Sequence, residues 1–171
     1  MLIIPTDRFP TDAPYSCLVI GYGNPLRQDD GVGQRVAETI ESWQLPGVRS
    51  LAVHQLTPDL AAEMAVVERV FFVDAIAVRP EAIEGKPPPI QVQSLQPQSG
   101  SLGGHAQDPG SLLHLTQMLY QVTPLTLQLL IPGVEFGFGE ALSPLAQAGV
   151  VAACKKLKEF IHTRIEKLAE Y

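Results

Sequence analysis

The sequence is poor in cysteine, with only Cys17 and Cys154 among its 171 residues. The two lie far apart and form no Cys-x-x-Cys pair, which argues against a thiolate zinc site. Both are expected to be buried, small apolar side chains. Such sparing use of cysteine fits a reducing, cytoplasmic setting.

Basic residues are also few: 12 Lys and Arg stand against 18 Asp and Glu, giving a net charge of −6. Neither nucleic acid nor an anionic membrane would attract such a surface, so we expect no partner of either kind. No apolar run approaches the roughly 18 residues that span a membrane, and the first residues lack the basic start of a signal peptide. We expect one α/β domain over residues 1–171, with residues 1–15 as a loosely ordered arm and a monomer as the default state.

Hydrophobic periodicity predicts strands alternating with helices along most of the chain. The expected strands are 16–22, 48–54, 69–76, 90–95 and 124–134. The expected helices are 31–43, a short one begun by Thr57 as N-cap, 111–122 and 144–169, with 79–89 as a linker. This order predicts an α/β fold: one open, mostly parallel sheet with helices on both faces.

Two of these strands have distinct patterns. Residues 69–76 (RVFFVDAI) are almost wholly apolar, as in a central parallel strand, and their one acid, Asp74, comes near the end. Residues 90–95 (IQVQSL) alternate apolar and polar side chains, which indicates a more exposed edge strand.

The glycine-rich stretch GYGNPLRQDDGVG, residues 21–33, follows the first strand but does not suit a phosphate. Leu26 stands where a dinucleotide fingerprint needs its third glycine. Asp29 and Asp30 place negative charge where a pyrophosphate would dock. The chain has neither a P-loop motif nor a G-x-S-x-G elbow, so hydride transfer, NTP hydrolysis and serine hydrolysis lose support.

The acids instead suggest a cation site. In an open α/β sheet, ligands bind beyond the carboxyl ends of strands where the strand order reverses. Asp30 follows the first strand, Asp74 ends the third, and the glycine loop of His105 is free to reach the same crevice. Two carboxylates and an imidazole make a divalent-cation site with open positions, and His54 would be a fourth polar group nearby.

Simpler roles are open for each residue. Asp29 or Asp30 would serve as a helix N-cap, and if only Asp30 touches the metal, Asp29→Ala would lose about 1 kcal/mol of helix capping at most. Asp74 would form a turn, His105 would be a solvated loop residue, and His54 would be a surface or capping residue.

GYGNPLRQDDGVG also resembles the G-x-G-N-x-L-x-x-D-[DE]-x-x-G signature of the endopeptidases that mature [NiFe]-hydrogenase large subunits. Further similarities lie in FFVDAI, GGHAQDPGSLLHL and IPGVEFGFGEALSP, so the resemblance covers most of the chain. It implies a five-stranded sheet of order 2-1-3-5-4 with strand 4 antiparallel. The segment HQLTPDL is similar to the cyanobacterial and bidirectional-hydrogenase branch, and it departs from the glycine-rich turn that many members have.

By motif position, the family's metal-contacting and catalytic residues fall on Asp30, Asp74 and His105, while Gly23 and Asn24 shape the loop that also carries Asp29. The implied activity is a single cut that removes the C-terminal extension of the hydrogenase large-subunit precursor after nickel insertion. The metal would then be the nickel of that precursor, and we expect no tightly bound cofactor of the protein's own. The residues alone leave open a non-catalytic α/β metal-sensing module and a stand-alone metallohydrolase, and they do not identify the general base.

Overall fold

The computed structural model describes residues 16–79, 88–98 and 108–171. Three predicted segments lie outside these ranges: the arm at 1–15, most of the linker at 79–89, and the loop that contains His105. The strands are β1 (Cys17–Tyr22), β2 (Val48–Val53), β3 (Arg69–Ala77), β4 (Gln91–Leu95) and β5 (Leu125–Gly133). The helices are η1 (Gln28–Gly31), α1 (Val32–Ser42), α2 (Leu60–Met64), α3 (Pro109–Tyr120), α4 (Pro144–His162) and α5 (Ile165–Leu168).

The five strands form one sheet in the order β2-β1-β3-β5-β4. β1 pairs in parallel with both β2 and β3, β3 pairs in parallel with β5, and β4 runs antiparallel to β5 at the edge. The α/β fold class, the strand order and the antiparallel fourth strand are therefore confirmed. The chain leaves β1 toward β2 on one side, while β3 lies on the other side, so the strand order reverses between β1 and β3.

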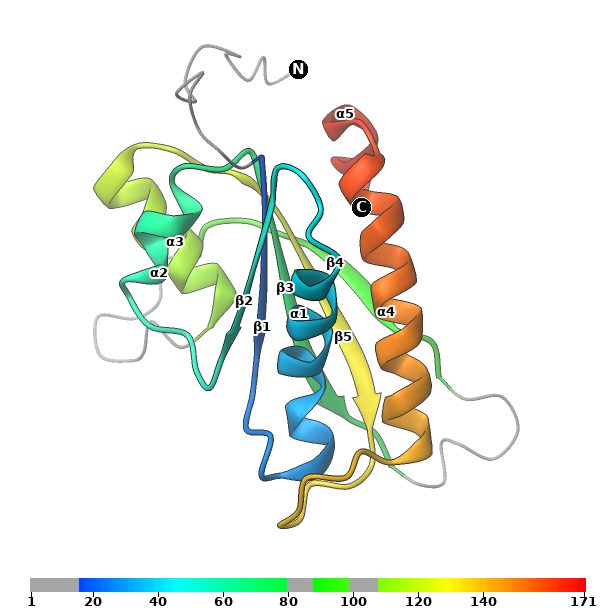
Figure 1. Cartoon of the computed structure of the whole chain (residues 1–171). Coiled ribbons are helices and arrows are strands. Elements are labelled where there is room, and N and C mark those ends of the chain that lie inside the picture. Colours follow the sequence, from blue (N-terminus) through cyan, green and yellow to red (C-terminus); the bar gives the residue numbers. More distant parts are fainter. Residues whose placement is uncertain (1–15, 80–87, 99–107) are drawn as a thin grey trace.

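Helices cover both faces of this sheet (Figure 1). One core cluster contains Val19 of β1 and Phe71 of β3, packed beneath α1 and α4. The second contains Ile20 and Phe72, packed beneath α2 and α3. Adjacent residues of one strand thus enter opposite cores, as the alternation of a pleated strand requires, and β3 is buried on both faces as its apolar sequence predicts.

The start of α1 lies directly against the ends of two strands. A Cβ atom on Gly33 would lie 2.4 Å from the carbonyl oxygens of both Tyr22 and Val73. Only glycine permits this approach, because real Cβ atoms do not come so close to backbone oxygen. Because Gly33 has no side chain, η1 and the first turn of α1 can lie at the point where the strand order reverses.

Three helix boundaries differ from the prediction. The N-cap of α2 is Asp59, so Thr57 is not the cap; its carbonyl instead closes the preceding turn by accepting from the Leu60 amide. α3 begins at Pro109, because the side chain of Asp108 caps it by accepting from the amide of Ser111 at 2.9 Å.

The last helix is the largest difference, because the predicted 144–169 helix is broken after His162. The guanidinium of Arg69, at the start of β3, donates to the carbonyls of Phe160, Ile161 and Thr163 at 3.4, 3.4 and 2.8 Å. They lie at the end of α4, where an α-helix leaves carbonyls without intrahelical partners, although that of Phe160 also accepts from the Thr163 amide. A cation at that end is also favoured by the helix dipole, so Arg69 stabilises the break and the separate turn of α5.

Candidate functional site

The candidate site lies at the carboxyl ends of the parallel strands, which are the arrowheads in Figure 1. Gly21 of β1 pairs with Val73 of β3, and this register places Tyr22 next to Asp74. Asp30 is on η1, the turn between β1 and α1, and η1 contacts β3. Asp30 and Asp74 therefore both lie at the edge of the sheet where the strand order reverses.

The loop that carries Asp30 has a conformation set by Gly23 and Asn24. Gly23 has φ of +132°, and a Cβ there would lie 1.9 Å from the carbonyl oxygen of Asp30. The amide of Asn24 donates to Oδ2 of Asp30 at 2.8 Å, and Oδ1 of Asn24 accepts from the amide of Leu26 at 2.9 Å. The two residues thus shape the loop, while Asp30 stays half-buried.

Asp74 lies in a polar cavity of about 370 Å³ between the sheet and the start of α3. The cavity is lined by Tyr22, Asp74, Gln93, Leu95, Gln98, Asp108, Pro109, Gly110 and Gln128. Burial raises the pKa of the Asp74 carboxyl, and the charge of Asp30 raises it further, while hydrogen bonds from Tyr22 and from the Ala75 amide oppose the rise.

Asp29 has a different role from its neighbour. Its side chain is fully buried. It accepts hydrogen bonds from the amides of Val134, Glu135 and Ser143 at 2.8, 3.0 and 2.7 Å, and from the Ser143 hydroxyl at 2.8 Å. Burial alone would raise the pKa of Asp29, but these donors outweigh it and lower the pKa below 3.8. The prediction of a simple helix N-cap is wrong for Asp29, because the N-cap of η1 is Arg27 and that of α1 is Gly31.

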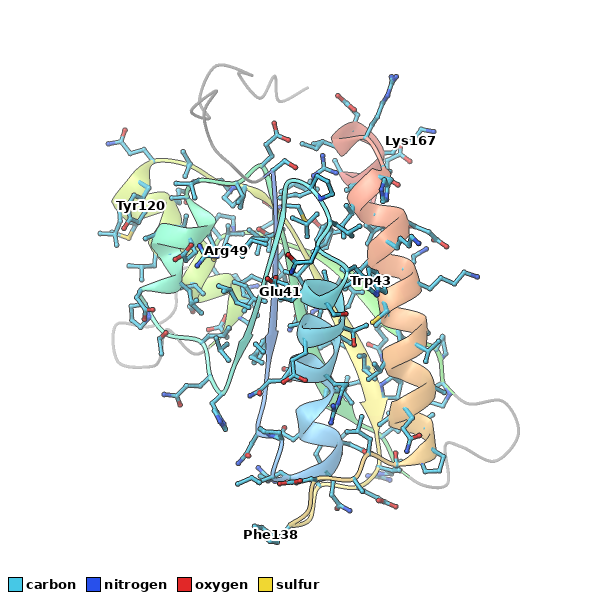
Figure 2. The ribbon with its side chains drawn as sticks, in the orientation of Figure 1. Glu41, Trp43, Arg49, Tyr120, Phe138 and Lys167 are labelled. Atoms are coloured by element: carbon cyan, nitrogen blue, oxygen red, sulfur yellow. The ribbon has the colours of Figure 1, made fainter. Side chains whose placement is uncertain are left out.

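Through Asp29, the loop after β1 is joined to the loop between β5 and α4. Ser143 links the two, because its hydroxyl also accepts from the Ala146 amide at 3.1 Å as the predicted N-cap of α4. Gln28 adds a second connection. Its backbone amide donates to the carbonyl of Gly139, and its side-chain oxygen accepts from the backbone amide of Gly137. Phe138, between these glycines, is 93% exposed at the tip of the molecule (Figure 2).

The remaining histidine predictions are answered only in part. His54 follows β2 and is exposed, which agrees with a surface role. His105 lies outside the described residues, so its place in the site stays a prediction. Within residues 16–79, 88–98 and 108–171, no group of three or more His, Cys, Asp or Glu side chains is arranged to hold a metal ion.

Sequence reasoning missed Tyr22, Gln93 and Gln128, which line the cavity with Asp74. The signal was present in β5, where Thr126 and Gln128 alternate with leucines, so one face of an otherwise apolar strand is polar. Nothing in the sequence showed that this face meets the end of β3.

The fold is shared with several solved structures. One is a [NiFe] hydrogenase maturation protease HycI from Thermococcus kodakarensis KOD1, with a TM-score of 0.63 and 18% identity over 86% of this chain and 92% of that chain. Another is a hydrogenase 2 maturation peptidase from a Thaumarchaeota archaeon, with a TM-score of 0.62 and 23% identity over 85% and 97%. The hydrogenase maturating endopeptidase HybD from E. coli has a TM-score of 0.62 and 18% identity over 82% and 88%.

These similarities cover most of both chains, but at such identities they establish the fold alone. No protein-family model matches the sequence, and no curated protein does. The structural neighbours do not test the cyanobacterial and bidirectional-hydrogenase branch. Among the described residues, no helix is long and apolar enough to cross a membrane.

Proposed function

We propose that this protein is an endopeptidase that removes the C-terminal extension of a [NiFe]-hydrogenase large-subunit precursor after nickel insertion. The observation that carries the proposal is the position of Asp30 and Asp74 at the reversal of strand order between β1 and β3. These are the positions at which the sequence signature predicts metal contacts, and the solved structures with this fold include maturation proteases.

The two carboxylates suit a cation that arrives with the substrate. Asp30 and Asp74 contribute two oxygen-bearing, negatively charged groups, which favour a divalent ion and disfavour an anionic substrate. Asp108 is the first described residue after the loop of His105 and follows His105 by three positions. It lines the same cavity as Asp74. A site of two oxygens and one imidazole has too few ligands to extract nickel from a thiolate-rich precursor, yet enough to detect it.

In this mechanism the nickel of the precursor is a recognition element supplied by the substrate. It polarises the scissile carbonyl or a water molecule, while a carboxylate accepts the proton. Burial raises the pKa of the Asp74 carboxyl, which favours proton acceptance by its carboxylate. The branch suggested by HQLTPDL and a cytoplasmic location remain parts of the same proposal.

The test is cleavage of a nickel-loaded large-subunit precursor, followed by mass spectrometry of the released C-terminal fragment. The matched variants are Asp74→Asn, which removes charge with little change in volume, and Asp59→Asn, which makes the same change at an exposed residue on the α2 N-cap. We expect the fragment from wild type and Asp59→Asn but not from Asp74→Asn.

Intact precursor with the wild-type protein, under conditions that support maturation, would indicate a non-catalytic metal-sensing module. Cleavage of unrelated peptides, together with retention of a metal ion through purification, would indicate a stand-alone metallohydrolase. Equal cleavage by wild type and Asp74→Asn would remove Asp74 from the site.

A further inference from the structure

The loop between β5 and α4 carries a phenylalanine that lies almost entirely in solvent. Phe138, near the middle of this loop, is 93% exposed. Phe136 of the same loop folds inward instead, and its ring lies over Gly133, where an added Cβ atom would be 2.9 Å from its Cζ atom. Leu26, in the loop after β1, is 45% exposed. We call Leu26 and residues 137–139 the aromatic tip.

The backbone of the aromatic tip is fixed on both sides of Phe138. The Gly139 amide donates to the carbonyl of Leu26 at 2.9 Å, and the Gln28 amide donates to the carbonyl of Gly139 at 2.8 Å. The side-chain oxygen of Gln28 accepts from the Gly137 amide at 3.0 Å. Because this backbone is already ordered, a partner that covers the ring loses little binding energy to loop ordering. Aromatic side chains in such positions often contribute much of the binding energy of an interface.

The aromatic tip lies at the same edge of the sheet as the two candidate carboxylates. Leu26 precedes Asp30 by four positions in one loop. Gly133, the last residue of β5, pairs with Ala77 of β3, three positions after Asp74. The loop that bears Phe138 therefore starts where the strands end, at the arrowheads of Figure 1. A large substrate that brings a metal ion to Asp30 and Asp74 approaches this edge.

Size and charge distinguish the partner of the aromatic tip. One phenylalanine buries roughly 150–250 Å², whereas a stable pair of proteins buries about 800 Å² on each side. The tip is therefore too small to hold a second copy of this chain by itself, but it can extend an interface that the metal site already forms. Among its exposed neighbours, Glu135 and Glu140 outnumber Arg27, which disfavours an anionic lipid surface.

We propose that Phe138, flanked by Leu26, docks into an apolar pocket on the surface of the precursor protein whose metal ion reaches Asp30 and Asp74. This inference rests on the proposed function, because the partner is the substrate of that reaction. The ring is remote from the bond that breaks, so its contact is equally strong before and during the cut. Loss of such a contact raises KM and leaves kcat unchanged.

The first experiment measures KM and kcat for cleavage of the nickel-loaded precursor by Phe138→Ala and Phe138→Leu. Tyr120→Ala is the matched control, because Tyr120 is an exposed aromatic residue at the end of α3, far from Phe138 (Figure 2). We expect Phe138→Ala to raise KM about 10-fold or more with kcat unchanged. Phe138→Leu should raise KM less, because it retains an apolar side chain, and Tyr120→Ala should behave as wild type.

The second experiment identifies the partner and does not depend on cleavage. A photo-reactive benzoyl-phenylalanine replaces Phe138 in one sample and Tyr120 in another, and each is irradiated with the nickel-loaded precursor. We expect a cross-link to the precursor from position 138 only, located by mass spectrometry. A cross-link between two copies of this chain instead, or no cross-link to the precursor, would overturn the proposal, as would a Phe138→Ala variant with the KM of Tyr120→Ala.

The two experiments separate this inference from the proposed function. Cleavage by the wild-type protein without a cross-link from position 138 would refute the docking role and leave the protease assignment intact. A cross-link to the precursor without cleavage would refute the protease assignment and support docking, and the dissociation constants of wild type and Phe138→Ala would then replace KM in the comparison.

Discussion

Replacing Asp29 by asparagine tests whether this aspartate joins two loops. The substitution keeps the shape of the side chain but turns one acceptor oxygen into a donor. If the amide oxygen replaces Oδ2, it retains the bonds from Val134, Glu135 and the Ser143 hydroxyl. The new NH₂ group then faces the Ser143 amide, which at present donates to Oδ1 at 2.7 Å.

The expected loss of stability follows from these contacts. One buried amide left unpaired costs about 1–3 kcal/mol, and each retained bond loses roughly 1 kcal/mol when its acceptor becomes neutral. Because such contributions are not additive, we expect about 3–5 kcal/mol in total. Asp30→Asn is the matched control: Asp30 is half-buried and accepts one described bond, from Asn24, so that change should be about 1 kcal/mol or less.

The assay is urea unfolding of the three proteins across a range of pH. Since the folded-state pKa of Asp29 is lowered below 3.8, its charge contributes stability above that pH, and the contribution is lost as pH falls through the folded pKa. The gap between wild type and Asp29→Asn should therefore be widest near neutral pH and narrow in acid. Equal losses for Asp29→Asn and Asp30→Asn at pH 7, or a gap independent of pH, would refute the reasoning.

Three further changes have expected outcomes. Asp74→Asn should raise the melting temperature at pH 7 while abolishing cleavage. The folded pKa of Asp74 is raised above 3.8, so its ionised form opposes folding at neutral pH, and the advantage of the variant should shrink on acidification; a lower melting temperature at pH 7 would contradict this. Ser143→Ala removes the α4 N-cap and one donor to Asp29, and should lose about 2 kcal/mol in urea unfolding; a loss under 0.5 kcal/mol would show that neither bond matters. Phe138→Ala should change stability by less than about 0.5 kcal/mol because the ring is exposed, and an increase in KM for the precursor would show that substrate contacts this tip, whereas an unchanged KM would exclude it.

The strands of the sheet were predictable because the hydrophobic pattern within each segment indicates how that segment is buried. The apolar run 69–76 could only be buried on both faces, and the alternation in 90–95 matches the exposed edge position of β4. The antiparallel direction of β4 and the strand order came from the resemblance, since periodicity does not give strand order.

The missed features depend on contacts between distant residues. Arg69 holds the end of α4 through carbonyls more than 90 positions later in the sequence, so nothing within 144–169 marked the break. The adjacent residues Asp29 and Asp30 look alike in the sequence. The loop that buries one of them begins 105 residues further on, at Val134. Residue pattern alone therefore located the pair, the family resemblance selected Asp30 for the metal contact, and neither showed that Asp29 is buried by a distant loop.

The close contact at Gly33 limits which substitutions can change the arrangement of Asp30 and Asp74. At position 33, helix α1 meets the carbonyl oxygens of Tyr22 and Val73 with no side chain between them, so any larger residue there would push the start of the helix away from the strand ends. Because Asp30 lies just before α1 and Asp74 directly follows Val73, a larger residue at position 33 would also move Asp30 relative to Asp74. Saturation mutagenesis at position 33, with selection for folded protein, should return glycine almost exclusively. New substrate preferences would then have to arise in the loops around Asp30 and Asp74.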